Sequence, residues 1–305
     1  MLAGLLAGGG GKDLDLHAVV ANMNVAQRRY WRAPLSVVLA VAFVFLPPAH
    51  AQDVGDRGAA NYVYSVFTGT GKYEVDDRTI YVVRMPLTLN WRKADHVEMK
   101  PGFRMLLPVA VGVSQFENIL DIPGFTLDDL QTMTVVPGVE VDIPLTRNWA
   151  LKPFAQAGWG WDLKDSRNSF VWGLGARTRA QLGERGEWLF GGEALTAGNE
   201  PGSDGSPTRF VRWMFGLEYK WQTDWAPFGR RVSLHPRLTQ RLFSNELELQ
   251  PPVEETLIRW TTEVGASVGI DPPINILGYK LSQAGVAYEF GDKLRAIKLI
   301  TKFPF

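Results

Sequence analysis

One short stretch of the chain places chemically capable side chains on a single face. Between positions 231 and 241 every second residue is polar or charged, namely Arg231, Ser233, His235, Arg237, Thr239 and Arg241. A period of two is that of a β-strand, so these side chains share one face of the strand. If that face lines a pore, the row is a wall that attracts anions. If acidic residues from other strands face it, the same row is an interior of paired charges.

The same row holds a candidate nucleophile and base, Ser233 and His235. A hydrolase needs a serine activated by a neighbouring base. Two residues apart on one strand face, their Cβ atoms lie roughly 6–7 Å apart, which predicts a poor direct hydrogen bond. We therefore expect no catalytic residues and no enzyme, and keep a phospholipase-like hydrolase as the less favoured alternative.

Metal and cofactor chemistry find little support. The chain has four His and no Cys, so no ligand cluster with metal spacing stands out, and His96 lies in a charged turn. We expect no metal and no cofactor. Lys+Arg and Asp+Glu are equal at 32 each, which gives no reason to expect nucleic acid as a partner.

The elements that position this row alternate apolar and polar residues over long segments. In the clearest, 79–92, Tyr81, Val83 and Met85 oppose Arg84 and Pro86. About twelve such segments are predicted, near 59–69, 79–92, 103–114, 132–145, 148–161, 169–182, 187–197, 211–221, 230–243, 255–270, 276–290 and 294–305. The alternation is weakest in 276–290, which indicates a bulge or a shorter strand.

Strands of ten or more residues are long for a soluble sandwich and match tilted membrane strands. Alternation alone leaves two orientations, with the apolar face inward in a soluble barrel or outward against lipid. The strand length, an exported amino-terminal segment and the aromatic ending at Phe303 and Phe305 favour lipid. We predict an all-β fold, a single antiparallel transmembrane β-barrel of about 12 strands with short periplasmic turns and longer external loops.

The amino-terminal segment has the pattern of a secretory signal peptide. Arg28, Arg29 and Arg32 precede the apolar run Leu35–Leu46, and Ala49–Ala51 is a small-residue cleavage site. We predict two parts: 1–51, an upstream segment plus cleaved signal peptide with its true start at Met23, and 52–305, the barrel.

The connections and aromatic residues fit two membrane interfaces. Turns at Thr146–Asn148, Gly183–Gly186 and Asp271–Ile274 are expected to be periplasmic, and loops at 116–130, 198–208 and 244–253 external. Tryptophans at strand ends predict an interfacial girdle, made of Trp91, Trp149, Trp159, Trp161, Trp172, Trp188 and Trp221.

Three segments carry a resemblance to a known family: Lys100–Val113 (KPGFRMLLPVAVGV), Val135–Gly160 and Tyr288–Phe305 (YEFGDKLRAIKLITKFPF). The chain resembles bacterial outer-membrane β-barrels and is similar to the solitary autotransporter-like barrels over nearly all of 52–305. The resemblance implies that Phe303 and Phe305 are an assembly signal. It implies as partners outer-membrane lipids, the barrel assembly machinery and periplasmic chaperones, and it offers no catalytic motif.

The predicted barrel turns the charged face of each strand into its lumen. The lumen-lining residues expected on this basis are Arg84, Glu140, Asp142, Glu193, Arg212, Glu218, Arg231, His235, Arg237, Arg241, Arg259 and Glu263. Because acids are numerous among them, we favour pairing over a free anion path. Two roles stay open: a porin-like channel for small solutes, with a narrow mixed-charge lumen, or a non-conducting structural or surface-interaction barrel. The sequence leaves the oligomeric state undetermined.

Overall fold

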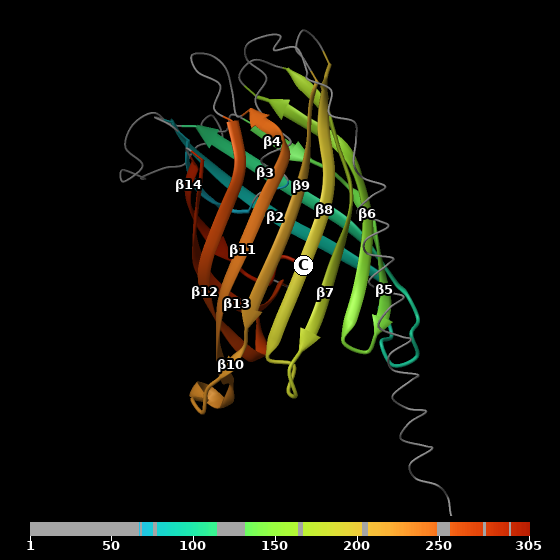
Figure 1. Ribbon diagram of the computed structural model, residues 1–305, viewed down its shortest axis with the longest axis vertical. Helices are drawn as coiled ribbons and strands as arrows, with labels where there is room; N and C mark the ends of the chain where they lie inside the picture. Colours follow the sequence, from blue (N-terminus) through green and yellow to red (C-terminus); the bar gives the residue numbers. More distant parts are fainter. Residues whose placement is uncertain are drawn as a thin grey trace, which may run out of the picture. The chain divides into compact units, whose positions relative to one another are not determined.

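The β-strands pair in sequence order until the last meets the first (Figure 1). The computed structural model describes residues 67, 69–75, 78–114, 132–163, 167–202, 207–248, 257–276, 279–292 and 294–305. Its strands are β1 (Gly71–Val75), β2 (Arg78–Arg92), β3 (Gly102–Ser114), β4 (Thr132–Val135), β5 (Gly138–Thr146), β6 (Trp149–Asp162), β7 (Asn168–Leu182), β8 (Trp188–Pro201), β9 (Thr208–Tyr219), β10 (Trp221–Gln222), β11 (Arg231–Glu248), β12 (Leu257–Ile276), β13 (Tyr279–Gly291) and β14 (Leu294–Ile300).

Closure of the barrel follows from the pairing of β1. Gly71 lies opposite Val82 of β2 on one side and opposite Lys298 of β14 on the other. Two wall strands are interrupted: β4 and β5 both pair with β3 and β6, and β9 and β10 both pair with β11. The fourteen strands therefore form a closed antiparallel barrel of twelve, as predicted.

Most predicted strand segments coincide with strands to within a few residues. The predicted strand 59–69 lies almost wholly outside the described residues, and the first described strand is β1. β11 and β12 run past their predicted ends, so that 244–248 of the predicted loop 244–253 belong to β11, and Asp271–Ile274, expected to be a turn, belongs to β12. Likewise 198–201 of the predicted loop 198–208 belong to β8. The strand predicted over 294–305 ends at Ile300, where β14 ends. The predicted loop 116–130 lies outside the described residues, as do 203–206 and 249–253 of the other two loops.

A register irregularity lies beside the segment 276–290, whose alternation is weak. The register between β12 and β13 shifts between the pairs Gly269–Gln283 and Ile274–Leu281. Four residues of β12 thus lie opposite a single residue of β13, which is a bulge. The extra residues are in β12 and precede 276–290, so the bulge predicted for that segment lies instead in the neighbouring strand, and β13 begins at Tyr279.

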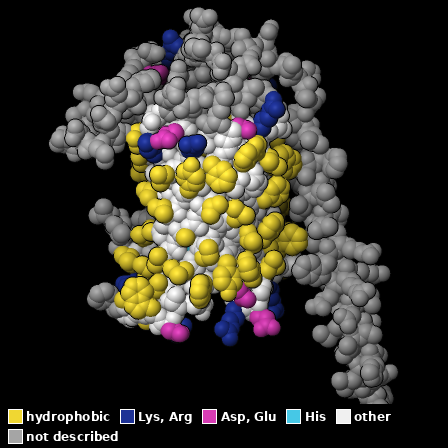
Figure 2. All heavy atoms as spheres, turned by 60° about the vertical axis from the view of Figure 1, so that its left-hand side comes forward, with side chains coloured by type: hydrophobic (Ala, Val, Ile, Leu, Met, Phe, Trp, Pro, Cys, Tyr) yellow, Lys and Arg dark blue, Asp and Glu magenta, His cyan; other side chains and the backbone are white. Residues whose placement is uncertain are grey.

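Apolar side chains cover the outside of the barrel (Figure 2). Buried charged side chains lie inside it. Leu89 is 60% exposed and Ile297 is 61% exposed, whereas Glu140 is 1% exposed and Glu263 is fully buried. Water would penalise so much exposed apolar surface, and a bilayer would not. Closed barrels satisfy every backbone hydrogen bond within the wall, as a bilayer requires. The fold is that of a transmembrane β-barrel, and the outward direction predicted for the apolar face is confirmed.

Aromatic side chains gather toward the two ends of the wall. Trp159 pairs with Phe170 across β6 and β7, with ring centroids 5.5 Å apart. At the other end Trp188 pairs with Tyr219 at 4.6 Å, and Trp91 and Trp221 are exposed there. Trp161 is exposed near the first pair, and Trp172 and Trp149 are half-buried on the outer wall, Trp172 near the first end and Trp149 near the second. No helix among the described residues is long and apolar enough to cross a membrane.

Candidate functional site in the barrel lumen

An apolar layer fills the lumen toward the end where β1 joins β2. Its buried residues come from nearly every wall strand and are Phe67, Tyr73, Val82, Leu106, Ala110, Val136, Phe154, Val171, Leu195, Ala197, Phe210, Ile258, Leu294 and Ala296. Phe67 precedes β1 and lies inside the barrel against Gly173, where a Cβ atom would overlap its ring. This part of the lumen is therefore packed like a protein core.

A first arc of ion pairs follows the wall from β3 to β9. Glu140 pairs with Arg104 and, at 3.0 Å, with Arg177. Arg177 Nε also donates to Glu193 at 2.7 Å, and Glu193 accepts from Arg212 at 2.5 Å. Each acid thus joins two bases, and the central base, Arg177, joins both acids. Arg212 further donates to the backbone oxygen of Phe67 at 2.6 Å, which ties the arc to the apolar layer.

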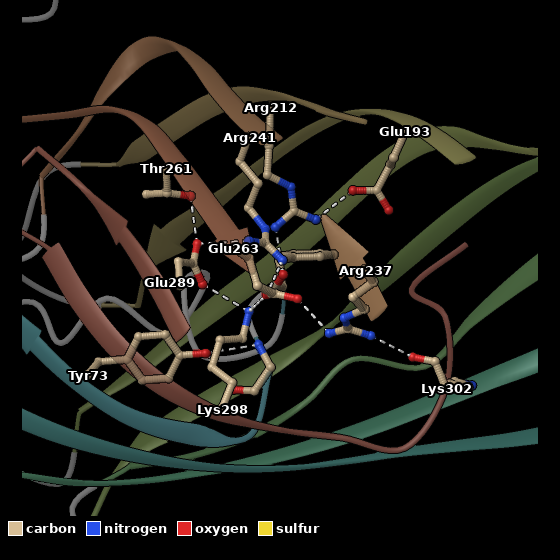
Figure 3. A network of polar contacts seen from close by, with 12 residues as sticks. Tyr73, Glu193, Arg212, Arg237, Arg241, Thr261, Glu263, Glu289, Lys298 and Lys302 are labelled. Atoms are coloured by element: carbon tan, nitrogen blue, oxygen red, sulfur yellow. Dashed lines mark hydrogen bonds and ion pairs between the residues drawn. The ribbon is translucent and has the colours of Figure 1, made fainter. Parts of the chain in front are cut away.

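A second arc runs from β11 to β14 (Figure 3). Glu263 accepts from three bases: Arg237 at 2.5 Å, Arg241 at 2.8 Å and Lys298 at 2.7 Å. Glu289 also accepts from Arg241 and Lys298, both at 2.9 Å, and from the Thr261 hydroxyl at 2.6 Å. Two carboxylates therefore pair with three cations, and each charged group of the arc contacts at least one group of opposite charge.

Burial distinguishes these arcs from the lining of an open pore. The side chains of Glu193, Arg212, Glu263 and Lys298 are 0–5% exposed, although a water-filled channel would leave them accessible. Buried charges persist only when paired and hydrogen-bonded. We conclude that these buried side chains exclude water where they lie, whereas Arg104 and Arg177 of the first arc are 26% and 16% exposed.

Ten of the twelve residues expected to line the lumen are buried or half-buried, and two are exposed. Arg231 and Arg259 lie on the same strand faces as the buried Ser233 and Thr261 but are exposed at the ends of β11 and β12. Arg212, Arg237, Arg241, Glu140, Glu193 and Glu263 belong to the two arcs, whereas Arg84 and Asp142 make no ion pair within the described residues. Glu218 and His235 lie together elsewhere on the wall.

Four members of the arcs were not predicted: Arg104, Arg177, Glu289 and Lys298. Lys298 lies between apolar residues of the last strand. Its position on the strand face opposite to Ile297 and Leu299 was the available signal that it points inward. Glu289 lies in the segment whose alternation is disturbed, so parity could not assign it a face. Arg104 and Arg177 have clean inward parity and could have been found from it.

Ser233 and His235 hydrogen-bond directly, contrary to the poor geometry predicted. Ser233 Oγ lies 2.8 Å from His235 Nε2, and His235 Nδ1 lies 3.0 Å from Glu218 Oε1. Spacing along an ideal strand overestimated the separation, because the two side chains converge over Gly269 of β12. A Cβ atom at Gly269 would overlap both of them. The order Ser, His, carboxylate is the one that activates a serine nucleophile.

The segment after β14 folds into the lumen instead of continuing the wall. Phe303 and Phe305 are 5% and 6% exposed and pack with Leu189 and Met214 of β8 and β9. The paired glycines Gly191 and Gly216 make room, because a Cβ atom on either would overlap the Phe305 ring. Arg237 donates to the Lys302 backbone oxygen at 3.0 Å (Figure 3). This segment, Thr301–Phe305, is the C-terminal plug.

A cavity of about 360 Å³ lies between the first arc and the C-terminal plug. Its wall includes His235, Glu218, Lys302 and Phe305. Within the described part of the chain, no group of three or more His, Cys, Asp or Glu side chains is placed to hold a metal ion.

Comparison with solved structures finds remote likenesses. The β domain of the Bordetella autotransporter BrkA is similar, with a TM-score of 0.45 and 12% sequence identity over 75% of this chain and 92% of that chain. It belongs to the class of barrels that the sequence segments resemble. No family model and no curated protein matches the chain. So remote a likeness carries nothing about function, for which the side chains of the lumen are the basis.

Proposed function

We propose that this chain is an integral barrel of a bacterial outer membrane whose lumen is closed, so that it acts through its surfaces and mouths. Export by the signal peptide that ends at Ala51 and insertion by the barrel assembly machinery belong to this proposal. The lipid-facing apolar wall supports the membrane location. Of the two roles left open by the sequence, the non-conducting barrel fits the lumen better than the solute channel.

The single observation that carries this choice is the burial of the two arcs. Glu263 is fully buried while it touches three bases. A solute or hydrated ion passing this level would have to separate charges that have no water to replace their partners. Separating a buried pair costs several kcal/mol, on the order of 3–5. The apolar layer and the C-terminal plug close the lumen at two further levels.

Conductance tests the proposal. The full chain, isolated from outer membranes in detergent, is added to a planar bilayer, and insertion is verified by heat-modifiable gel migration of the reconstituted protein. We expect no steady current. Steady, ion-selective openings of the inserted protein would establish the channel instead.

A second candidate function rests on the Ser233–His235–Glu218 chain, which favours acyl transfer by a serine. His235 would take the proton of Ser233 Oγ as that oxygen bonds to an ester carbonyl carbon, then return it to the leaving alcohol. Water would release the acyl group by the same steps in reverse. His235 and Glu218 line the internal cavity and do not face lipid, so the substrate would be a small soluble ester.

A fluorophosphonate probe decides this second candidate. We expect labelling of the folded full chain at Ser233, lost in Ser233→Ala and reduced at least about a hundredfold in rate in His235→Gln. Ser282→Ala is the matched control, since Ser282 lines the same cavity without a histidine partner among the described residues. Labelling that persists in His235→Gln, or no labelling of the folded barrel, would remove the candidate.

A further inference from the structure

The internal cavity is strongly cationic. Seven basic side chains line it, against Glu218 as the acidic residue of the lining. They are Arg84, Arg104, Lys152, Arg177, Arg179, Lys220 and Lys302, and they come from β2, β3, β6, β7, the β9–β10 junction and the C-terminal plug. Cations therefore converge on one space from several sides, which is how proteins focus a potential on an anion.

Five of these cations form no ion pair in the described part of the chain. Arg104 and Arg177 belong to the first arc and are paired with Glu140. Of the other five, Lys152 is attracted by Asp142, and Arg179 is attracted by Asp142 and Glu218, at distances longer than an ion pair. The Nε atom of Arg84 is buried and has no hydrogen-bond partner. An uncompensated charge in a barrel interior is costly, so this wall is suited to hold an anion.

The pKa of Lys302 reflects the same excess of positive charge. It follows β14 and is reached by water at the cavity mouth. Partial burial, followed by repulsion from Arg104, Arg84 and Arg177, lowers the pKa of Lys302 to about 8, and Glu140 opposes this only weakly. Lys152, Arg179, Lys220, Glu218 and His235 complete the charged and titratable groups that line the cavity. A bound anion would relieve this repulsion.

The rest of the lining is apolar. Leu106, Pro108, Leu189, Phe303, Pro304 and Phe305 form much of it. Gln181 and Lys302 are exposed at the end of the barrel where β14 ends, so the cavity opens to water at that mouth. Ligand pockets in proteins typically combine such an apolar lining with a few placed polar groups.

We propose that this cavity binds a small organic anion, with a phosphate or carboxylate group against Arg84 and Lys152 and an apolar part against the C-terminal plug. The site needs only the cavity and is independent of whether the lumen conducts. It also differs from the anion wall considered from sequence at Arg231–Arg241, because Arg237 and Arg241 of that row are neutralised by Glu263 and Glu289.

The site is tested by titrating the purified full chain with phenyl phosphate and measuring the heat of binding by calorimetry. We expect saturable binding at pH 7, with competition by inorganic phosphate and none by phenol or benzylamine. Arg84→Gln and Lys152→Gln should each weaken the Kd about tenfold or more, since each removes a charge-assisted contact. Arg185→Gln is the control, because Arg185 is an exposed cation in the turn between β7 and β8, at the same mouth, and does not line the cavity. The Kd of this variant for phenyl phosphate should stay within about twofold of the wild-type value.

The pH dependence gives an additional readout. Phenyl phosphate is already a dianion above its second pKa near 6, whereas Lys302 loses its charge as the pH rises through about 8. Affinity should therefore fall between pH 7 and pH 9. Lys302→Gln, which lies outside every strand, should make that fall smaller without unfolding the barrel. The proposal would be overturned if phenyl phosphate showed no saturable binding to the folded barrel. It would also be overturned if Arg84→Gln and Arg185→Gln lost affinity equally.

Discussion

Glu263→Gln should destabilise the folded barrel by about 3–5 kcal/mol, the cost of breaking a buried charge cluster from one side. The substitution keeps the size of the side chain and removes the charge shared by Arg237, Arg241 and Lys298. Three buried cations would then depend on Glu289 alone, which contacts two of them. The free energy of unfolding is measured by urea titration of the protein in lipid vesicles, with tryptophan fluorescence as the signal.

Glu200→Gln provides the comparison for this experiment. Glu200 pairs with Arg209 at 2.8 Å, but both side chains are exposed, at 41% and 56%. Water and salt screen such a pair, so its loss should cost about 0–1 kcal/mol. Equal effects of the two substitutions would mean that Glu263 is solvated and that the second arc does not fill the lumen.

Phe305→Ala should cost about 3–5 kcal/mol of folding free energy, the usual loss for a buried phenylalanine truncated to alanine. Its ring is 6% exposed against Leu189, Met214 and the Gly191–Gly216 pair. Refolding from urea into vesicles, without any assembly machinery, isolates this packing contribution from any role of the residue as an assembly signal.

Thr301→Ala is the matched control, because Thr301 lies in the same plug and is exposed. It should change the free energy of unfolding by less than about 0.5 kcal/mol. If Phe305→Ala also refolds with unchanged stability, the plug is not packed in the lumen. A defect seen only in cells would then assign Phe305 to assembly alone.

Much of the barrel could be predicted from sequence because its signal is local. Alternation with a period of two fixes which residues of a strand share a face, as in β2, and turn residues separate the strands. The direction of the apolar face required information beyond alternation, namely strand length and the signal-peptide pattern predicted in the amino-terminal segment. Alternation failed at the β12–β13 bulge, where four residues of β12 lie opposite one residue of β13.

The lumen was predictable only in part, because it depends on contacts between distant strands. Parity identified Glu263 and Arg241 as inward but could not show that Glu263 holds three bases. Ideal strand spacing led to the wrong geometry for Ser233 and His235, whose contact depends on Gly269 of the next strand. The inward turn of Phe303 and Phe305 was also missed. Their alternation continues that of β14, and the glycines that receive Phe305 lie on β8 and β9.

The central claim is that paired charges and apolar side chains close the lumen, and conductance tests it most directly. Many copies of the full chain, verified as folded barrels, are reconstituted in a planar bilayer and observed under applied voltage. The closed lumen predicts an electrically silent membrane. Long-lived unitary currents from the wild-type protein would contradict it, because ions would then pass the level at which Glu263 is fully buried.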